Sequence, residues 1–132
     1  MLRPVRRLFV ALLAGAAFVG CGSSGPTDEQ QVRETVDAFS NATAAKDYDK
    51  LCKQLLAPKL LEQVEQAGVP CEVALSKGLG EVKDPKVTIG QVTVSGDSAT
   101  ADIRTSAAGE EPSRDTLKLS KVGGRWRIAS LG

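Results

Sequence analysis

The chain has 132 residues, with 17 lysines and arginines against 16 aspartates and glutamates, so it lacks the basic excess typical of nucleic-acid-binding proteins. It contains no histidine, which removes the commonest general base and the commonest metal ligand. A length of this order suits one domain with a single core of modest size. We therefore expect no metal site, no cofactor and no nucleic-acid partner.

The first twenty residues have the pattern of an export leader. Residues 1–7 carry three arginines and no acid, and residues 8–19 form an uncharged apolar run. A basic segment, an apolar segment and small residues at the cut are the parts of a secretory signal peptide. The apolar run is shorter than the roughly 20 residues that a membrane-spanning helix needs. Without the three leader arginines, fourteen bases remain against 16 acids, a net charge of about −2.

The end of the leader is the segment Phe18-Val19-Gly20-Cys21, which resembles the lipobox of bacterial lipoproteins. Leucine is usual at the first of these positions, so Phe18 departs from the pattern, whereas the other three residues fit it. The resemblance implies a diacylglyceryl group on the Cys21 thiol and cleavage before that residue. Each buried acyl methylene then contributes about 0.8 kcal/mol to membrane attachment. An ordinary leader followed by an incidental cysteine is the alternative.

The division of the chain follows from this leader. Residues 1–20 are predicted to be a lipoprotein signal peptide, and residues 21–26 a lipidated cysteine with a flexible tether. Residues 27–132 are predicted to form a single domain. The expected location is the cell membrane, with the lipid anchor on its extracytoplasmic side.

Cys52 and Cys71 remain for the exported domain. Two such cysteines in a small exported domain usually form a disulfide. Their separation of 19 positions predicts a stabilisation of about 3 kcal/mol. Two buried thiols, or a metal site that would need two further ligands, are the alternatives.

Helical signals occupy the first half of the domain. A capping box with Thr27 as the N-cap opens an apolar pattern of helical spacing, which predicts a helix over 27–45. Asp47 can cap a second helix, which ends before a proline because the preceding residue avoids the α region. Shorter helical segments are expected over 58–66 and 72–75.

Strand signals occupy the second half. A change in the phase of apolar alternation at Gly90-Gln91 indicates a β-bulge. Turns at Gly96-Asp97 and Gly123-Gly124 predict hairpins, and 107–112 is a polar loop. The residues expected on the inner face of the later strands are Ala99, Ala101, Ile103, Thr105, Leu117, Leu119, Trp126 and Ile128. Helices followed by four strands predict an α+β fold.

This order of elements resembles the nuclear transport factor two-like cone (also called cystatin-like or SnoaL-like), and more closely the small exported lipoproteins of high-GC Gram-positive bacteria. The features that carry the resemblance are Ala38-Phe39, the 46–49 turn, the two cysteines and the segment 124–128. It covers Thr27 to Leu131. It implies N-terminal helices packed on a curved four-stranded antiparallel sheet that encloses a pocket. The superfamily contains isomerases, dehydratases and hydrolases as well as members that only bind.

No catalytic residue is assigned. Within the cone, the candidate pocket-lining residues are Phe39, Tyr48, Ile103 and Trp126, although Tyr48 and Trp126 also suit core positions. The strand acids Asp102 and Asp115 are expected to face solvent.

Three kinds of function agree with these observations. The first is a binding domain whose cone holds a small lipophilic ligand, or whose sheet docks an envelope protein. The alternative is an isomerase or hydrolase that uses a buried carboxylate such as Asp37 or Asp49, with a pKa raised by an apolar cavity. A structural or accessory lipoprotein without a ligand is the third. The scarcity of reactive side chains favours a binding or accessory role over catalysis.

Overall fold

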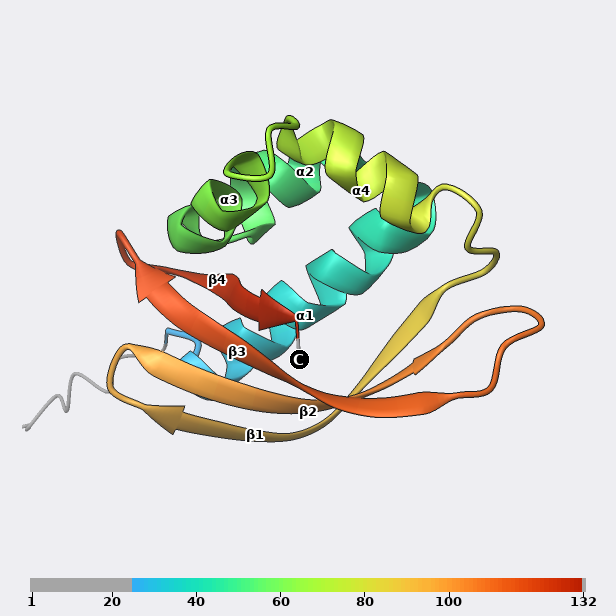
Figure 1. Cartoon of the computed structure of the whole chain (residues 1–132). Coiled ribbons are helices and arrows are strands. Elements are labelled where there is room, and N and C mark those ends of the chain that lie inside the picture. Colours follow the sequence, from blue (N-terminus) through green and yellow to red (C-terminus); the bar gives the residue numbers. More distant parts are fainter. Residues whose placement is uncertain (1–24, 132) are drawn as a thin grey trace, which may run out of the picture.

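The computed structural model describes residues 25–131. Cys21 and the other residues of the proposed signal peptide and lipobox lie outside the described residues. The elements comprise a helical half followed by four strands (Figure 1). This is the predicted α+β class, with helices packed on a four-stranded antiparallel sheet.

Helix α1 (Asp28–Ala45) begins at the predicted capping box. The Thr27 hydroxyl accepts a hydrogen bond from the Gln30 backbone N–H, and the Gln30 side chain accepts one from the Thr27 N–H. These two bonds satisfy donors that a helix start otherwise leaves unpaired. The helix ends at Lys46, which adopts a left-handed conformation with φ 55°.

The remaining helical elements are short. They are α2 (Tyr48–Lys50), the π-helical turn η1 (Leu51–Leu55), α3 (Pro58–Glu65) and α4 (Cys71–Leu79). Asp47 caps α2 as expected, because its carboxylate accepts a hydrogen bond from the Lys50 N–H at 3.1 Å. Helix α4 is longer than the one or two turns that the sequence predicts, since it continues through Gly78 to Leu79.

The sheet is a meander in which each strand pairs with the next: β1 (Lys86–Ser95), β2 (Ser98–Ser106), β3 (Ser113–Val122) and β4 (Arg125–Leu131). The register of β1 against β2 shifts between Ile89 and Val92, which confirms the predicted bulge. A second shift, between Lys118 and Leu119 in the β3–β4 pair, was not predicted. Both glycine-containing hairpin turns form where expected.

The helices cover one face of the sheet, and the strands curve around α1 (Figure 1). Helix α1 packs against both edge strands, β1 and β4, because the sheet curls far enough to bring both edges to it. The main core fills this curve. Its most deeply buried side chains include Val32, Val36, Leu56, Ala101, Leu117, Leu119 and Ile128.

Candidate functional site

Two adjoining cavities lie between the helical layer and the inner face of the sheet. One has a volume of about 270 Å³ and opens between the end of α4 and the β2–β3 loop; the other, about 260 Å³, lies beside α4. Both are lined by Phe39, Thr43, Leu79 and Leu131. We call this region of the molecule the open end of the cone.

The walls of the cavities are mainly apolar. The cavity beside α4 is also lined by Leu51, Leu56, Ala74, Leu75 and Gly78. Apolar walls with a few polar groups are the usual composition of a small-molecule site.

Thr43 lines both cavities, although its hydroxyl oxygen is shielded from solvent. The residue is 6% exposed, and its hydroxyl has no hydrogen-bond partner within residues 25–131. A buried hydroxyl without a partner costs free energy, because it has lost its hydrogen bonds to water.

The mouth of the larger cavity contains a short chain of polar side chains. The Thr105 and Ser113 hydroxyls lie 2.7 Å apart, and the Ser113 hydroxyl donates to the Asp115 carboxylate at 3.2 Å. Asp115 pairs with Ile103 across the β2–β3 ladder, and lines the cavity together with Leu117. The chain therefore lies on the inner side of the sheet, at its exposed end.

Asp115 is exposed to solvent, as the sequence predicts, but it lies on the same side of its strand as the apolar residues and not on the opposite side. Alternate residues of a strand face the same side, and Asp115 precedes Leu117 by two positions, so it shares the inner face with that leucine. Asp102 does lie on the outer face, where it accepts a hydrogen bond from the Thr116 hydroxyl at 3.3 Å. The strand phase thus contained a signal for Asp115 that the sequence reasoning missed.

The structure brings together two of the four candidate pocket residues. Phe39 lines both cavities and Ile103 lines the larger one. Tyr48 instead packs against the buried cluster of Ala42, Leu51 and Leu55, beside α1. Trp126 is 4% exposed in the main core and borders a separate groove between α1 and β4. Whether Phe39 or Ile103 contacts a ligand stays a prediction.

The opposite end of the molecule contains Asp28, Lys121 and Trp126. We call this region the closed end. The Asp28 carboxylate accepts hydrogen bonds from the Lys121 ammonium at 2.8 Å and from the Trp126 indole N–H at 3.1 Å. The bond from Lys121, followed by that from Trp126, holds the pKa of Asp28 below its ordinary value of 3.8. This carboxylate joins the start of α1 to strands β3 and β4.

A disulfide between Cys52 and Cys71 confirms the predicted pairing. It joins η1 to the first residue of α4. At the other end of α4, the Lys46 ammonium donates a hydrogen bond to the Gly80 carbonyl. Helix α4, which forms one wall of the cavities, is therefore attached at both ends.

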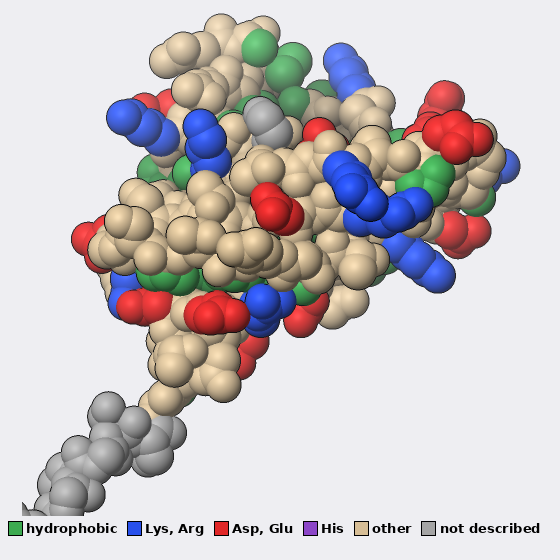
Figure 2. Space-filling model, turned by 90° about the horizontal axis from the view of Figure 1, so that it is seen from below, with side chains coloured by type: hydrophobic (Ala, Val, Ile, Leu, Met, Phe, Trp, Pro, Cys, Tyr) green, Lys and Arg blue, Asp and Glu red, His purple; other side chains and the backbone are tan. Residues whose placement is uncertain are grey.

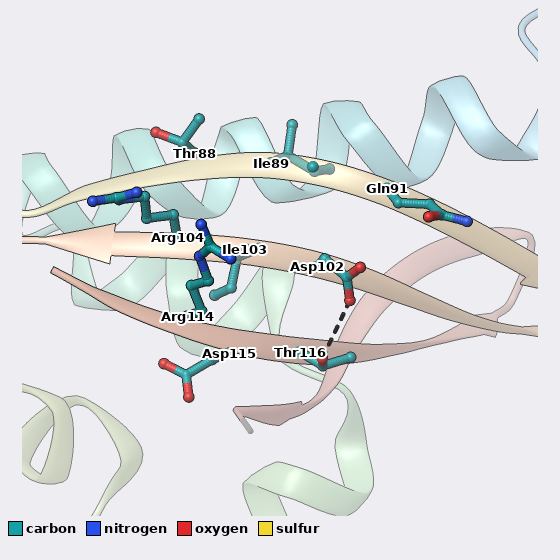
Figure 3. Close-up of a pocket in the computed structure, with 10 residues that line it drawn as sticks. Thr88, Ile89, Gln91, Asp102, Ile103, Arg104, Arg114, Asp115 and Thr116 are labelled. Atoms are coloured by element: carbon teal, nitrogen blue, oxygen red, sulfur yellow. Dashed lines mark hydrogen bonds between the residues drawn. The ribbon is translucent and has the colours of Figure 1, made fainter.

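The outer face of the sheet carries an open hollow of about 480 Å³. Arg104 and Arg114 lie opposite one another on β2 and β3, whereas the Asp115 side chain points away from them (Figure 3). Acidic and basic side chains are both spread over the same side of the molecule, and several basic side chains lie close together on one part of it (Figure 2). This hollow is larger than either cavity inside the cone, but the two cavities offer more enclosed and more apolar surroundings for a ligand.

Within residues 25–131, no helix is long and apolar enough to cross a membrane. The same residues contain no group of three or more histidine, cysteine, aspartate or glutamate side chains arranged to hold a metal ion.

Solved structures show which fold this is. A Kribbella flavida protein is 19% identical and superposes with a TM-score of 0.52, over 75% of this chain and 84% of its own. A nuclear transport factor 2-like protein of unknown function from Silicibacter pomeroyi is 18% identical, with a TM-score of 0.52 over 75% and 87% of the two chains. A de novo designed protein of the same fold is 15% identical, with a TM-score of 0.53 over 80% and 87%.

The fold is therefore nuclear transport factor two-like, as the sequence resemblance predicts. No known sequence family matches the chain, and no curated protein matches it in sequence. At identities below 20%, these neighbours define the fold and not the function.

Proposed function

We propose that the protein is an exported lipoprotein, held by a lipid on Cys21 at the extracytoplasmic side of the cell membrane, whose cone binds a small apolar ligand without chemically changing it. The observation that carries the binding role is the pair of adjoining apolar cavities, which share the lining residues Phe39, Thr43, Leu79 and Leu131. The lipobox resemblance of residues 18–21 supports the anchor.

The size of the cavities supports a small ligand. A volume of about 270 Å³ corresponds to about nine water molecules, at about 30 Å³ for each. A molecule with roughly ten non-hydrogen atoms would fill one cavity, and a longer one could extend into the other past Phe39.

The carboxylates that the catalytic alternative would use lie elsewhere. Asp37 is exposed on α1, and Asp49 is exposed on α2, where it forms an ion pair with Lys53. Neither residue lines the two cavities. A general acid or base needs hydrogen-bond reach of its substrate, so these positions give little support to catalysis inside the cone.

Native mass spectrometry of protein purified from its own cell envelope tests the binding role. We expect a non-covalent adduct in the native spectrum that is lost on denaturation. The variant Leu79→Trp places a larger side chain at a position that lines both cavities, and is expected to abolish the adduct. Its matched control is Val73→Trp, which adds the same ring system on the same helix at a position that is 39% exposed.

Bare protein in the native spectrum, or an adduct retained by Leu79→Trp with wild-type thermal melting, would contradict ligand binding in the cone. A defined protein multimer in place of the adduct would instead support docking of a protein partner. The denatured mass tests the anchor, because a diacylglyceryl group adds its mass to the chain. Membrane fractionation of Cys21→Ser tests it again, and retention of the variant in the membrane fraction would contradict lipid anchoring.

A further inference from the structure

The mouth of the larger cavity carries more acid than base. Its lining includes the carboxylates of Glu110, Glu111 and Asp115 and one ammonium group, that of Lys86. A cavity mouth lined mainly by one sign of charge attracts ligands of the opposite sign. The charge at the mouth therefore favours a cation.

Asp115 is the acid best placed to contact a ligand head group. It shares the inner face of the sheet with Leu117, and one of its carboxylate oxygens accepts from Ser113. No lysine or arginine of the described segment lies within ion-pair distance of it, whereas Asp28, Glu29 and Asp49 all have such partners. Since an ionised carboxylate offers about four acceptor positions, Asp115 keeps capacity for a further donor.

The wall behind this mouth is apolar. Phe39 and Leu79 line the cavity together with Asp115. The site therefore combines a negative mouth with an apolar wall, which is the complement of a molecule with a cationic end and an apolar body.

We infer that the ligand is a cationic amphiphile, whose ammonium group is bound by Asp115 at the mouth and whose apolar body lies against Phe39 and Leu79. This inference rests on the proposed binding function and specifies the class of ligand. Asp115 donates no proton and forms no covalent bond to the ligand; it contributes charge attraction and accepts a hydrogen bond from the ammonium group.

Three eight-carbon probes that differ only at the head group test the inference. Octylammonium, octanol and octanoate are titrated at pH 7 into the isotopically labelled domain, and the dissociation constants are read from amide chemical shifts. We expect octylammonium to bind about fivefold more tightly than octanol, as for one ion pair at a partly solvated site, and octanoate to bind more weakly than octanol.

Two matched variants test whether Asp115 causes the preference for octylammonium over octanol. Asp115→Asn is expected to reduce the preference for octylammonium over octanol to less than twofold while leaving octanol binding unchanged. Asp102→Asn removes a carboxylate from the outer face of the neighbouring strand and is expected to keep the full preference.

The outcomes separate the two proposals. If none of the probes binds, the cavity is no ligand site, and the proposed function fails together with the inference. If octanol binds as tightly as octylammonium, or if Asp115→Asn keeps the preference, the cone still binds apolar molecules but the inferred ligand class is wrong.

Discussion

The polar groups at the closed end of the cone are hydrogen-bonded more completely than those at the open end. At the closed end, the indole N–H of a nearly fully buried tryptophan is paired with Asp28, which Lys121 also contacts. At the open end, the Thr43 hydroxyl is buried without a partner in the described chain, and Asp115 forms no ion pair with another residue of 25–131. The paired groups at the closed end stabilise the fold, whereas those at the open end leave hydrogen-bonding capacity unused.

Substituting one aromatic residue at each end should show the difference in stability between the two ends most clearly. Trp126→Ala is expected to lower the free energy of unfolding by about 3–5 kcal/mol, because the indole is buried in the core. Phe39→Ala should lower it by no more than about 2 kcal/mol, because this side chain is partly exposed and already borders a cavity. Urea denaturation measures both, and equal losses would contradict the distinction between the two ends.

The disulfide holds the wall of the open end, so its removal gives the next largest effect. Cys52→Ala/Cys71→Ala is expected to lower the free energy of unfolding by about 3 kcal/mol, as loop closure over 19 positions suggests. Urea denaturation of wild type in reducing buffer should give the same loss. A variant as stable as the oxidised wild type would show that packing holds α4 without the covalent link.

The sequence predicted the elements whose signals are local. Helix α1 forms where the capping box begins, and the β3–β4 hairpin turns at Gly123-Gly124, since both signals depend on neighbouring residues. The disulfide followed from the count of cysteines in an exported domain.

Other features depend on contacts between distant segments. Helix α4 continues through Gly78 even though glycine costs about 1 kcal/mol in a helix. Leu75, one turn earlier, packs against the core, and Leu79 lines the two cavities. The π-helical turn over Leu51–Leu55 and the shift at Lys118 likewise have no local signal in the sequence. The cavities form where these distant elements meet. The sequence therefore predicted only two of the residues that line them, Phe39 and Ile103.

A smaller effect is expected when the unpaired hydroxyl is removed from the open end. Thr43→Val keeps the shape of the side chain, and should raise the free energy of unfolding by about 1 kcal/mol, because the buried hydroxyl has no partner in residues 25–131. The matched control is Thr35→Val on the same helix, which removes a hydroxyl that donates to the Gln31 carbonyl at 2.9 Å. Urea denaturation that finds no gain for Thr43→Val, or an equal gain for Thr35→Val, would contradict the account.

The smallest effect concerns the pH dependence of the closed end. Because the folded pKa of Asp28 is lowered, its ionised form contributes stability that is fully present above the ordinary pKa of 3.8 and is lost as the pH falls through the folded value. Asp28→Asn should therefore have a lower melting temperature than wild type at pH 6, with the difference narrowing below about pH 4. Asp37→Asn, an exposed change on the same helix, is the control. A difference that persists to pH 2 would rule out the carboxylate as its source.

The attachment of α4 also has a consequence for how the protein is produced. In a thiol-reducing cytosol the first residue of that helix would keep only non-covalent contacts, whereas in an oxidising compartment the disulfide would fix it to η1. Protein produced in the two compartments would share one sequence but differ in how rigidly α4 is held beside the two cavities. The redox history of a sample would then affect any probe affinity that is measured for it.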